Sequence, residues 1–209
     1  MADITLYGDA RSSFTWTTRL ACAEKGITHE LAGLEFGSPE MLAMHPFGKI
    51  PFMRHGNFVL HETSAICRYI DDAFDGPPLQ PTEIRERALM DQWISSLGDY
   101  FYDPLIRRYV LQYVFAKGKD GGPDRSVIDP AIEEIKGRLA IVESALDGKA
   151  FLAGSAFSIA DMILTPILSY VRMMPEGADL MTPCPNVTRV HDALMARPSF
   201  AATRPQTPA

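Results

Sequence analysis

Short apolar runs alternate with amphipathic segments along the first third of the chain. By their length and flanking turn residues, we expect strands at residues 4–7, 27–34, 51–54 and 57–60. Residues 13–25 and 63–74 are expected to be helices, and Ser38-Pro39 is a helix-start signal. The pattern predicts the element order β-α-β-α-β-β-α.

A stiff segment interrupts this alternation. Residues 75–81 contain three prolines and one glycine, a composition typical of a linker. We therefore expect a first domain at residues 1–76, a linker at 77–81 and a second domain at 82–209.

Only helical periodicity follows the linker. Helices are expected at residues 82–117, 129–147, 158–173 and 187–196. Pro104 marks the expected bend in the first of them. The third is apolar nearly all round, which predicts a buried central helix, and Ser158 and Asp161 have the spacing of a capping box at its start. The second domain is therefore expected to be all-α.

Composition and charge narrow the function. The chain has 20 Lys and Arg residues against 26 Asp and Glu, a formal net charge of −6, so it lacks the basic excess that binding to a nucleic-acid backbone needs. No apolar run approaches the length of a membrane helix, and no secretion signal is visible. The cysteines, Cys22, Cys67 and Cys184, form no C-x-x-C pair. We expect a cytoplasmic protein without a nucleic-acid, membrane or metal partner.

Ser12-Ser13-Phe14 follows the first predicted strand and begins a helix. Unpaired backbone N–H groups and the helix dipole favour an anion at such a place. On this pattern alone, either serine is as readily explained as a simple N-cap.

His45-Pro46-Phe47-Gly48-Lys49-Ile50-Pro51 is the second motif. A cis Ile50–Pro51 bond would leave the Ile50 backbone free to pair with an extended ligand, and Lys49 could meet a ligand carboxylate. Read alone, the segment is equally a loop with two prolines.

Glu62-Thr63 is the third motif, at a turn that enters a helix. Thr63 could hold a carboxylate through its N–H and hydroxyl, and Glu62 could hold an ammonium group. Together they would bind both charges of an α-amino acid head group, although a solvated acid followed by a cap gives the same pattern.

These motifs and the capping box, in this order and spacing, resemble the cytosolic glutathione transferase family, in particular its bacterial, serine-type members. The resemblance covers residues 3–200. The family's cis-proline motif is matched by residues 47–51, and its acidic-hydroxyl pair by Glu62-Thr63. The resemblance implies a thioredoxin-like N-terminal domain with a mixed four-stranded sheet, an all-helical C-terminal domain, and glutathione as co-substrate without a metal.

The resemblance also implies roles for individual residues. Ser12 takes the catalytic position, as a hydrogen-bond donor to the glutathione sulfur, and Ser13 takes the place of a proline; which of the two contacts the sulfur stays open. Glutathione would be bound by Lys49, Ile50, Pro51, Glu62 and Thr63.

Some positions depart from the family pattern. His45 stands where Asn is common, and Thr63 replaces the more usual Ser. Residues 36–38 carry no basic side chain for the glycyl carboxylate of glutathione, where many relatives keep one.

An electrophile pocket between the domains is also implied. On position alone its candidates are Phe14, Tyr102, Arg107, Tyr109 and Tyr113, although each aromatic residue is at least as readily explained as core or interface. The family usually forms homodimers, which predicts a dimer of this chain.

Three functions remain open at this point. The first is a glutathione transferase that attacks an apolar electrophile with the glutathione thiolate. The second is an interaction module that keeps the fold without catalysis. The third is a glutathione-dependent isomerase, dehalogenase or peroxidase.

Overall fold

The computed structural model describes residues 3–116, 118 and 120–205. They form two compact units. One unit holds the described residues up to Pro81 together with those from Ala196 on, and the other is Thr82–Met195.

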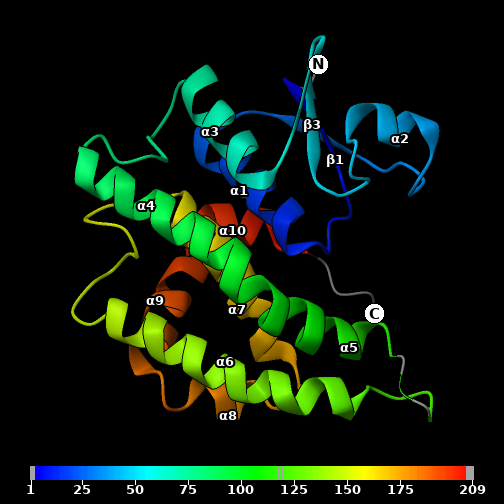
Figure 1. The fold of residues 1–209 in the computed structure, drawn as a ribbon. Helices are drawn as coiled ribbons and strands as arrows, with labels where there is room; N and C mark the ends of the chain where they lie inside the picture. The colour runs from blue at the N-terminus through cyan, green and yellow to red at the C-terminus, as the bar shows by residue number, and fades with distance from the viewer. Residues whose placement is uncertain (1–2, 117, 119, 206–209) are drawn as a thin grey trace. The chain divides into compact units, whose positions relative to one another are not determined.

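The first unit is built on a four-stranded sheet in the order β2-β1-β3-β4, of which β1 and β3 are labelled in Figure 1. Its strands are β1 (Ile4–Tyr7), β2 (His29–Ala32), β3 (Phe52–His55) and β4 (Phe58–His61). β2 runs parallel to β1, whereas β3 runs antiparallel to both β1 and β4. The helices among the strands are α1 (Ser13–Lys25), α2 (Pro39–Met44) and α3 (Thr63–Ala73). The predicted element order and mixed sheet are confirmed.

Side chains of a strand alternate between the two faces of a sheet. Both faces of this sheet carry buried side chains, and helices cover both. On one face the rings of Tyr7 and Phe52 stack with centroids 4.7 Å apart and pack with Met41 of α2. Leu6 and Met53 alternate with them along the strands and are fully buried, so their side chains lie on the opposite face. α1 and α3 lie on the other side of the sheet from α2 (Figure 1). The turn after Tyr7 connects the end of β1 directly to the start of α1.

The linker is tied down by a buried ion pair. Lys25 Nζ, at the end of α1, lies 2.9 Å from Asp71 Oδ1 of α3, and both side chains are more than nine-tenths buried. Asp71 also accepts hydrogen bonds from Leu79 N–H at 2.9 Å and Gln80 Nε2 at 3.1 Å. Gly76, with φ of +130°, passes so close to Lys25 that a Cβ there would lie 3.2 Å from its Cα. Charge and close approach together hold residues 76–80 against the first unit.

The C-terminal segment differs from the expectation of one domain over residues 82–209. A helix missed in the sequence, α10 (Pro198–Thr203), packs against α1. Trp16 Nε1 donates to Thr203 Oγ1 at 3.0 Å, and Arg19 Nη1 donates to Thr203 O at 2.9 Å. Arg197 forms two hydrogen bonds with the Glu24 carboxylate. These contacts join residues more than 170 positions apart in the sequence, so no local pattern predicts them.

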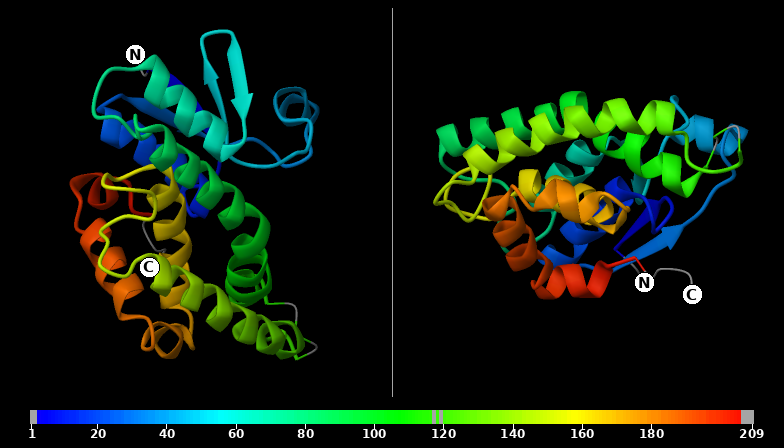
Figure 2. Two further views of the ribbon diagram at one scale, coloured as in Figure 1. Left: turned by 60° about the vertical axis from the view of Figure 1, so that its left-hand side comes forward. Right: turned by 90° about the horizontal axis from the view of Figure 1, so that it is seen from below.

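The second unit is all-helical, as predicted. Its helices are α4 (Ile84–Ser96), η1 (Leu97–Phe101), η2 (Asp103–Val110), α5 (Leu111–Val114), α6 (Arg125–Ala145), α7 (Ile159–Met173), α8 (Gly177–Met181) and α9 (Pro185–Met195). Within this unit α7 runs among the others and contacts α4, η2, α8 and α9 (Figure 2). Twelve of its residues are buried, which confirms the expected central helix. No helix in the described part of the chain is long and apolar enough to cross a lipid bilayer.

The helix expected over residues 82–117 contains wider turns in its middle. Tyr102 N–H donates to Leu97 O, five residues back, and Leu111 N–H donates to Ile106 O in the same way. Such π-type turns interrupt the ordinary α-helical ladder. Pro104, the expected bend, lies inside η2, but the wide turns begin before it, so its missing N–H is not their sole cause.

The capping box at the start of α7 is formed as predicted. Asp161 Oδ2 accepts from Ser158 N–H at 3.0 Å and from Ser158 Oγ at 2.9 Å, while Oδ1 accepts from Leu152 N–H at 2.8 Å. Burial nevertheless raises the pKa of Asp161 to about 6, against the lowering effect of these donors.

Candidate functional site

Ser12 caps the N-terminus of α1. Its extended backbone begins the helix, and its Oγ accepts a hydrogen bond from Thr15 N–H at 3.3 Å. Ser12 N–H donates to Asp9 O at 3.0 Å, which closes the turn after β1. The Ser12 hydroxyl is half-buried, and its own proton has no acceptor among the described residues. The cap therefore uses a lone pair of Ser12 and leaves its O–H available to a ligand.

Two further hydroxyls lie beside Ser12, inside the first turns of α1. Ser13 Oγ and Thr15 Oγ1 are buried and have no hydrogen-bond partner among the described residues. A side chain at Gly8, just after β1, would put its Cβ 2.4 Å from Thr15 Oγ1, so glycine allows the turn to approach α1 this closely. Ser13 is thus enclosed, whereas Ser12 is the serine that reaches the surface.

The loop that leads into β3 contains the expected cis peptide bond between Ile50 and Pro51. Ile50 is half-buried, and Lys49 beside it is exposed. His45 begins this loop and is buried, with Nδ1 accepting from Phe47 N–H at 3.3 Å and its ring 4.6 Å from that of His61. Burial lowers the pKa of His45, and the neighbouring His61 adds to that effect. Where relatives commonly carry Asn, a neutral imidazole thus holds this loop against β4.

Glu62 is the N-cap of α3 and has an unusual backbone. Its φ is +74°, and it is the only non-glycine residue with positive φ in the described part of the chain. Such a conformation is strained for an L-residue and is typical of functional sites. The Glu62 side chain is exposed, and Thr63, the first residue of α3, is buried. Both predicted residues therefore stand at a helix N-terminus.

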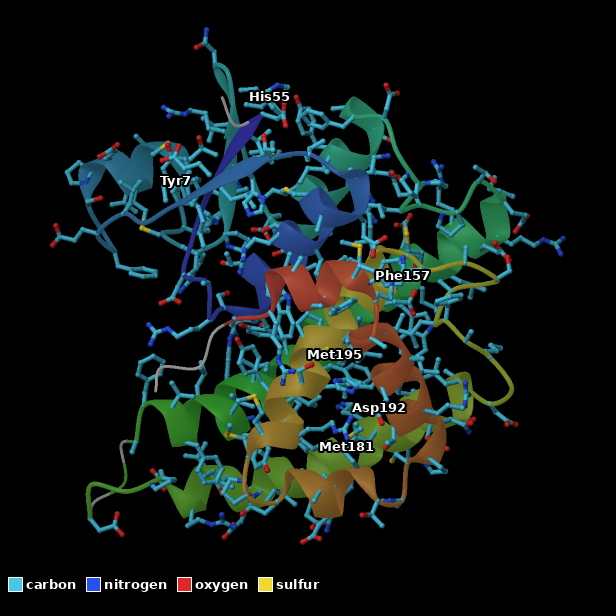
Figure 3. All side chains as sticks on the ribbon, turned by 180° about the vertical axis from the view of Figure 1, so that it is seen from behind. Tyr7, His55, Phe157, Met181, Asp192 and Met195 are labelled. Atoms are coloured by element: carbon cyan, nitrogen blue, oxygen red, sulfur yellow. The ribbon has the colours of Figure 1, made fainter. Side chains whose placement is uncertain are left out.

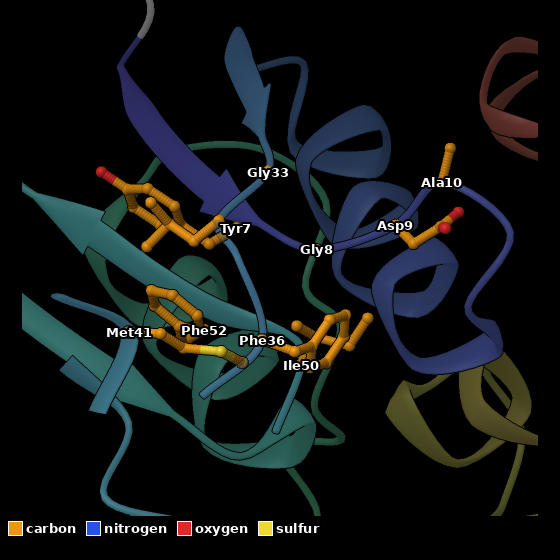
Figure 4. Close-up of a pocket in the computed structure, with 10 residues that line it drawn as sticks. Tyr7, Gly8, Asp9, Ala10, Gly33, Phe36, Met41, Ile50 and Phe52 are labelled. Atoms are coloured by element: carbon orange, nitrogen blue, oxygen red, sulfur yellow. The ribbon is translucent and has the colours of Figure 1, made fainter. Parts of the chain in front are cut away.

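A cavity of about 340 Å³ lies beside the turn after β1 and the loop that contains Ile50, within the first unit (Figure 4). It is lined by Tyr7, Gly8, Asp9, Ala10, Gly33, Leu34, Phe36, Met41, Ile50 and Phe52. Of the predicted site residues, Ile50 alone is in this lining. The other lining residues were not predicted, because they come from segments that lie far apart in the sequence and share no motif. The one signal in the sequence was the lack of a basic residue at positions 36–38; in the structure Phe36 is 65% exposed.

The residues predicted to line an electrophile pocket are not among those that line this cavity. Phe14 is half-buried in the first turn of α1, and the guanidinium of exposed Arg107 lies 5.5 Å from the centroid of the Tyr102 ring. Tyr109 is fully buried, and its place in an electrophile pocket stays a prediction.

Tyr109 and Tyr113 instead share one acceptor. Both hydroxyls donate to the Glu176 carboxylate, at 3.1 and 2.7 Å, and Arg125 forms an ion pair with the same group. Burial, with Glu176 as an added cause, raises the pKa of Tyr113 to about 12. These tyrosines join η2 and α5 to the start of α8, a structural role that neighbouring sequence does not reveal.

A Ser-His-Asp grouping in the second unit is not a nucleophile site. His191 of α9 lies 2.9 Å from Ser169 Oγ through Nε2 and 3.3 Å from Asp192 through Nδ1; Asp192 and Met195 are labelled in Figure 3. Arg172 is also 2.8 Å from Nδ1, and because arginine only donates, Nδ1 must accept and Nε2 must carry the proton. His191 therefore donates to Ser169 and is not a base for it.

Comparisons with known proteins converge on one family. Models for the N-terminal and C-terminal domains of glutathione S-transferase match residues 6–78 and 102–198. The chain is 30% identical over 201 residues to glutathione S-transferase 4 of Zea mays, covering 94% of this chain and 89% of the relative.

Solved structures agree. Glutathione transferase F7 from Populus trichocarpa has a TM-score of 0.85 and 28% identity, covering 96% of this chain and 97% of that one. Glutathione S-transferase I from maize, in complex with an atrazine glutathione conjugate, has a TM-score of 0.85 and 28% identity, with coverage of 97% and 96%.

Proposed function

The chain belongs to the glutathione S-transferase family and is a glutathione transferase, and from this premise we propose that Ser12 activates the glutathione thiol. A free thiol has a pKa near 8.5 and is only a few per cent ionised at neutral pH. A hydrogen bond from the Ser12 O–H and the N-terminal N–H groups of α1 both stabilise the thiolate. The observation that carries this proposal is the Ser12 cap, which accepts from Thr15 N–H and leaves its own proton free to donate.

We propose that the rest of glutathione lies along the loops beside Ser12. The Ile50 backbone pairs with the cysteinyl part, next to Pro51, and Lys49 faces the peptide. Glu62 binds the γ-glutamyl ammonium, while Thr63 and the N-terminus of α3 bind its carboxylate. The strained backbone of Glu62 supports this assignment.

The reaction is a displacement or an addition at carbon. The thiol proton leaves to solvent before attack. The thiolate sulfur then forms a bond to the electrophilic carbon with its electron pair, and a leaving group, where there is one, departs with the pair of the broken bond. We propose that the cavity beside Ile50 receives the apolar part of the electrophile, because Leu34 and Phe36 are among its walls.

The decisive experiment uses the unmodified protein with glutathione and a chloro-dinitrobenzene-type electrophile. We expect retention on immobilised glutathione and formation of the conjugate, measured by its absorbance. Retention without turnover of a panel of aryl, alkyl and epoxide electrophiles would contradict the proposal and favour an interaction module.

We also propose that the chain forms a homodimer. Phe47 is 69% exposed at the loop before β3, and Leu42 of α2 is 44% exposed in the same unit; closed two-fold pairs are the commonest way to cover such surface. Sedimentation velocity at micromolar concentration is expected to give twice the 23.1 kDa of the chain. Phe47→Ser is expected to weaken the dimer, and Phe115→Ser, which changes a similarly exposed ring in the other unit, serves as control. A monomer for the unmodified protein would refute the dimer.

We place the protein in the cytoplasm. Its cysteines, Cys22, Cys67 and Cys184, are free and buried in the structure, which fits a reducing compartment. Fractionation of the source cells tests this, and recovery outside the cytoplasmic fraction would contradict it.

A further inference from the structure

The turn that presents Ser12 carries an ion pair of its own. Arg11 N–H and Nε donate to Asp9 Oδ1 at 2.8 and 3.0 Å, and Arg11 Nη2 lies 2.6 Å from Oδ2. The same Asp9 accepts Ser12 N–H through its backbone oxygen. The side-chain carboxylate and the backbone oxygen of Asp9 therefore both stabilise the turn from which the Ser12 hydroxyl projects.

Asp9 also stands in the wall of the cavity (Figure 4). It is the one charged residue among the described residues that line it. Hydrogen bonds from Arg11 lower the pKa of Asp9, so this carboxylate is ionised at neutral pH. The other residues in the wall are apolar, glycine or Tyr7, and none of them offsets that charge.

A negative charge at this place opposes the proposed chemistry. The thiolate is stabilised by positive potential at the N-terminus of α1, and a bare carboxylate three residues before Ser12 would cancel part of that potential. Arg11 supplies the opposite charge in a geometry that occupies both carboxylate oxygens. Its removal would leave the turn with a net charge of −1 beside the sulfur.

We propose that Arg11 is a positioning residue for catalysis, which neutralises Asp9 so that the turn can hold Ser12 without destabilising the glutathione thiolate. This inference rests on the proposed role of Ser12. The pair contributes little to the stability of the fold, because the Arg11 and Asp9 side chains are 63% and 41% exposed and exposed ion pairs add little to the free energy of folding.

The sign of the effect follows from the charges. Arg11→Gln leaves the Asp9 carboxylate unopposed, which disfavours the thiolate and raises the thiol pKa. The acidic limb of the pH profile of kcat/KM is then expected to move up by about half to one pH unit, and rates below the limb to fall about 3- to 10-fold. Above the limb the rates are expected to be equal. Asp9→Asn removes the negative charge of the pair and is expected to move the limb to lower pH, and the double variant is expected to restore its original position.

Salt provides a second readout. Because the pair is exposed, screening at high ionic strength is expected to shrink the shift between the Arg11→Gln variant and the unmodified protein. A control is Lys136→Gln, which removes one exposed, ion-paired positive charge from α6 and should leave the limb unmoved.

The experiment measures pH profiles of kcat/KM and the ultraviolet absorbance of bound glutathione thiolate for these variants at low and high salt. A pH-independent loss in Arg11→Gln, or an unchanged limb, would overturn the inference. Failure of the proposed function is seen separately, as absent glutathione-dependent turnover in the unmodified protein or full activity in Ser12→Ala.

Discussion

Replacing Ser12 with alanine is expected to lower turnover about 10²-fold while glutathione still binds. The variant removes the one hydroxyl that we propose to donate to the sulfur, and loss of a single oriented donor typically has an effect of this size. The contacts that we propose for the γ-glutamyl and cysteinyl parts come from other elements, so retention on glutathione resin should persist. The measurement is kcat with a chloro-dinitrobenzene-type electrophile, beside the dissociation constant of glutathione from calorimetry.

Ser12→Ala also removes a helix cap, which costs about 1 kcal/mol of stability. Asp124→Ala is the matched control, because Asp124 caps α6 through Ser126 N–H in the other unit. That variant should lose similar stability and keep its turnover. Full activity in Ser12→Ala would move the role to Ser13 or Thr15, whose buried hydroxyls have no partner among the described residues.

The largest expected effect on stability comes from the buried pair of Lys25 and Asp71. Asp71→Ala leaves the Lys25 ammonium buried without its ion-pair partner and removes the acceptor of Leu79 N–H. Breaking such a pair from one side typically costs about 3–5 kcal/mol. Urea unfolding, followed by circular dichroism, measures the loss, and the linker should become sensitive to proteases at residues 76–80.

The double variant Lys25→Met, Asp71→Leu distinguishes two causes of the lost stability, a buried unpaired charge and lost packing. It should recover part of the stability, because no unpaired charge remains, although Leu79 N–H still lacks its acceptor. Glu133→Ala breaks the exposed pair with Lys136 and should change stability by less than about 1 kcal/mol. A loss of that small size in Asp71→Ala would show that the pair is not what holds the linker.

Local signals in the sequence placed most elements correctly because their physics is local. Ser12 and Gly26 mark the two ends of α1, since a cap hydroxyl and a left-handed glycine each satisfy backbone groups within one turn. The Ser158–Asp161 capping box works over the same short range. Ile50 and Glu62 were predicted as site residues from motifs whose order, more than any one of them, indicates the family.

Interactions between distant segments escaped prediction for the corresponding reason. Nothing near Tyr109 signals that its hydroxyl meets Glu176, 67 residues away, so its aromatic ring looked equally suited to a pocket. The cavity walls likewise come from β1 and the turn after it, the segment after β2, α2, and the loop that leads into β3 with the first residue of that strand. Periodicity reports which face of an element is apolar, but it does not report which other element covers that face.

The sequence by itself determined the element order and the all-helical second unit, because these follow from periodicity and caps. Its ordered motifs indicated the family, and that resemblance implied the mixed sheet. Only the tertiary structure decided that α10 belongs with the first unit, that Tyr109 is buried, and that Ser12 rather than Ser13 reaches the surface. It also decided that Asp9, paired with Arg11, stands in the cavity wall. Each of these depends on which distant groups pack together, and packing is settled by burial and charge pairing across the fold, not along the chain.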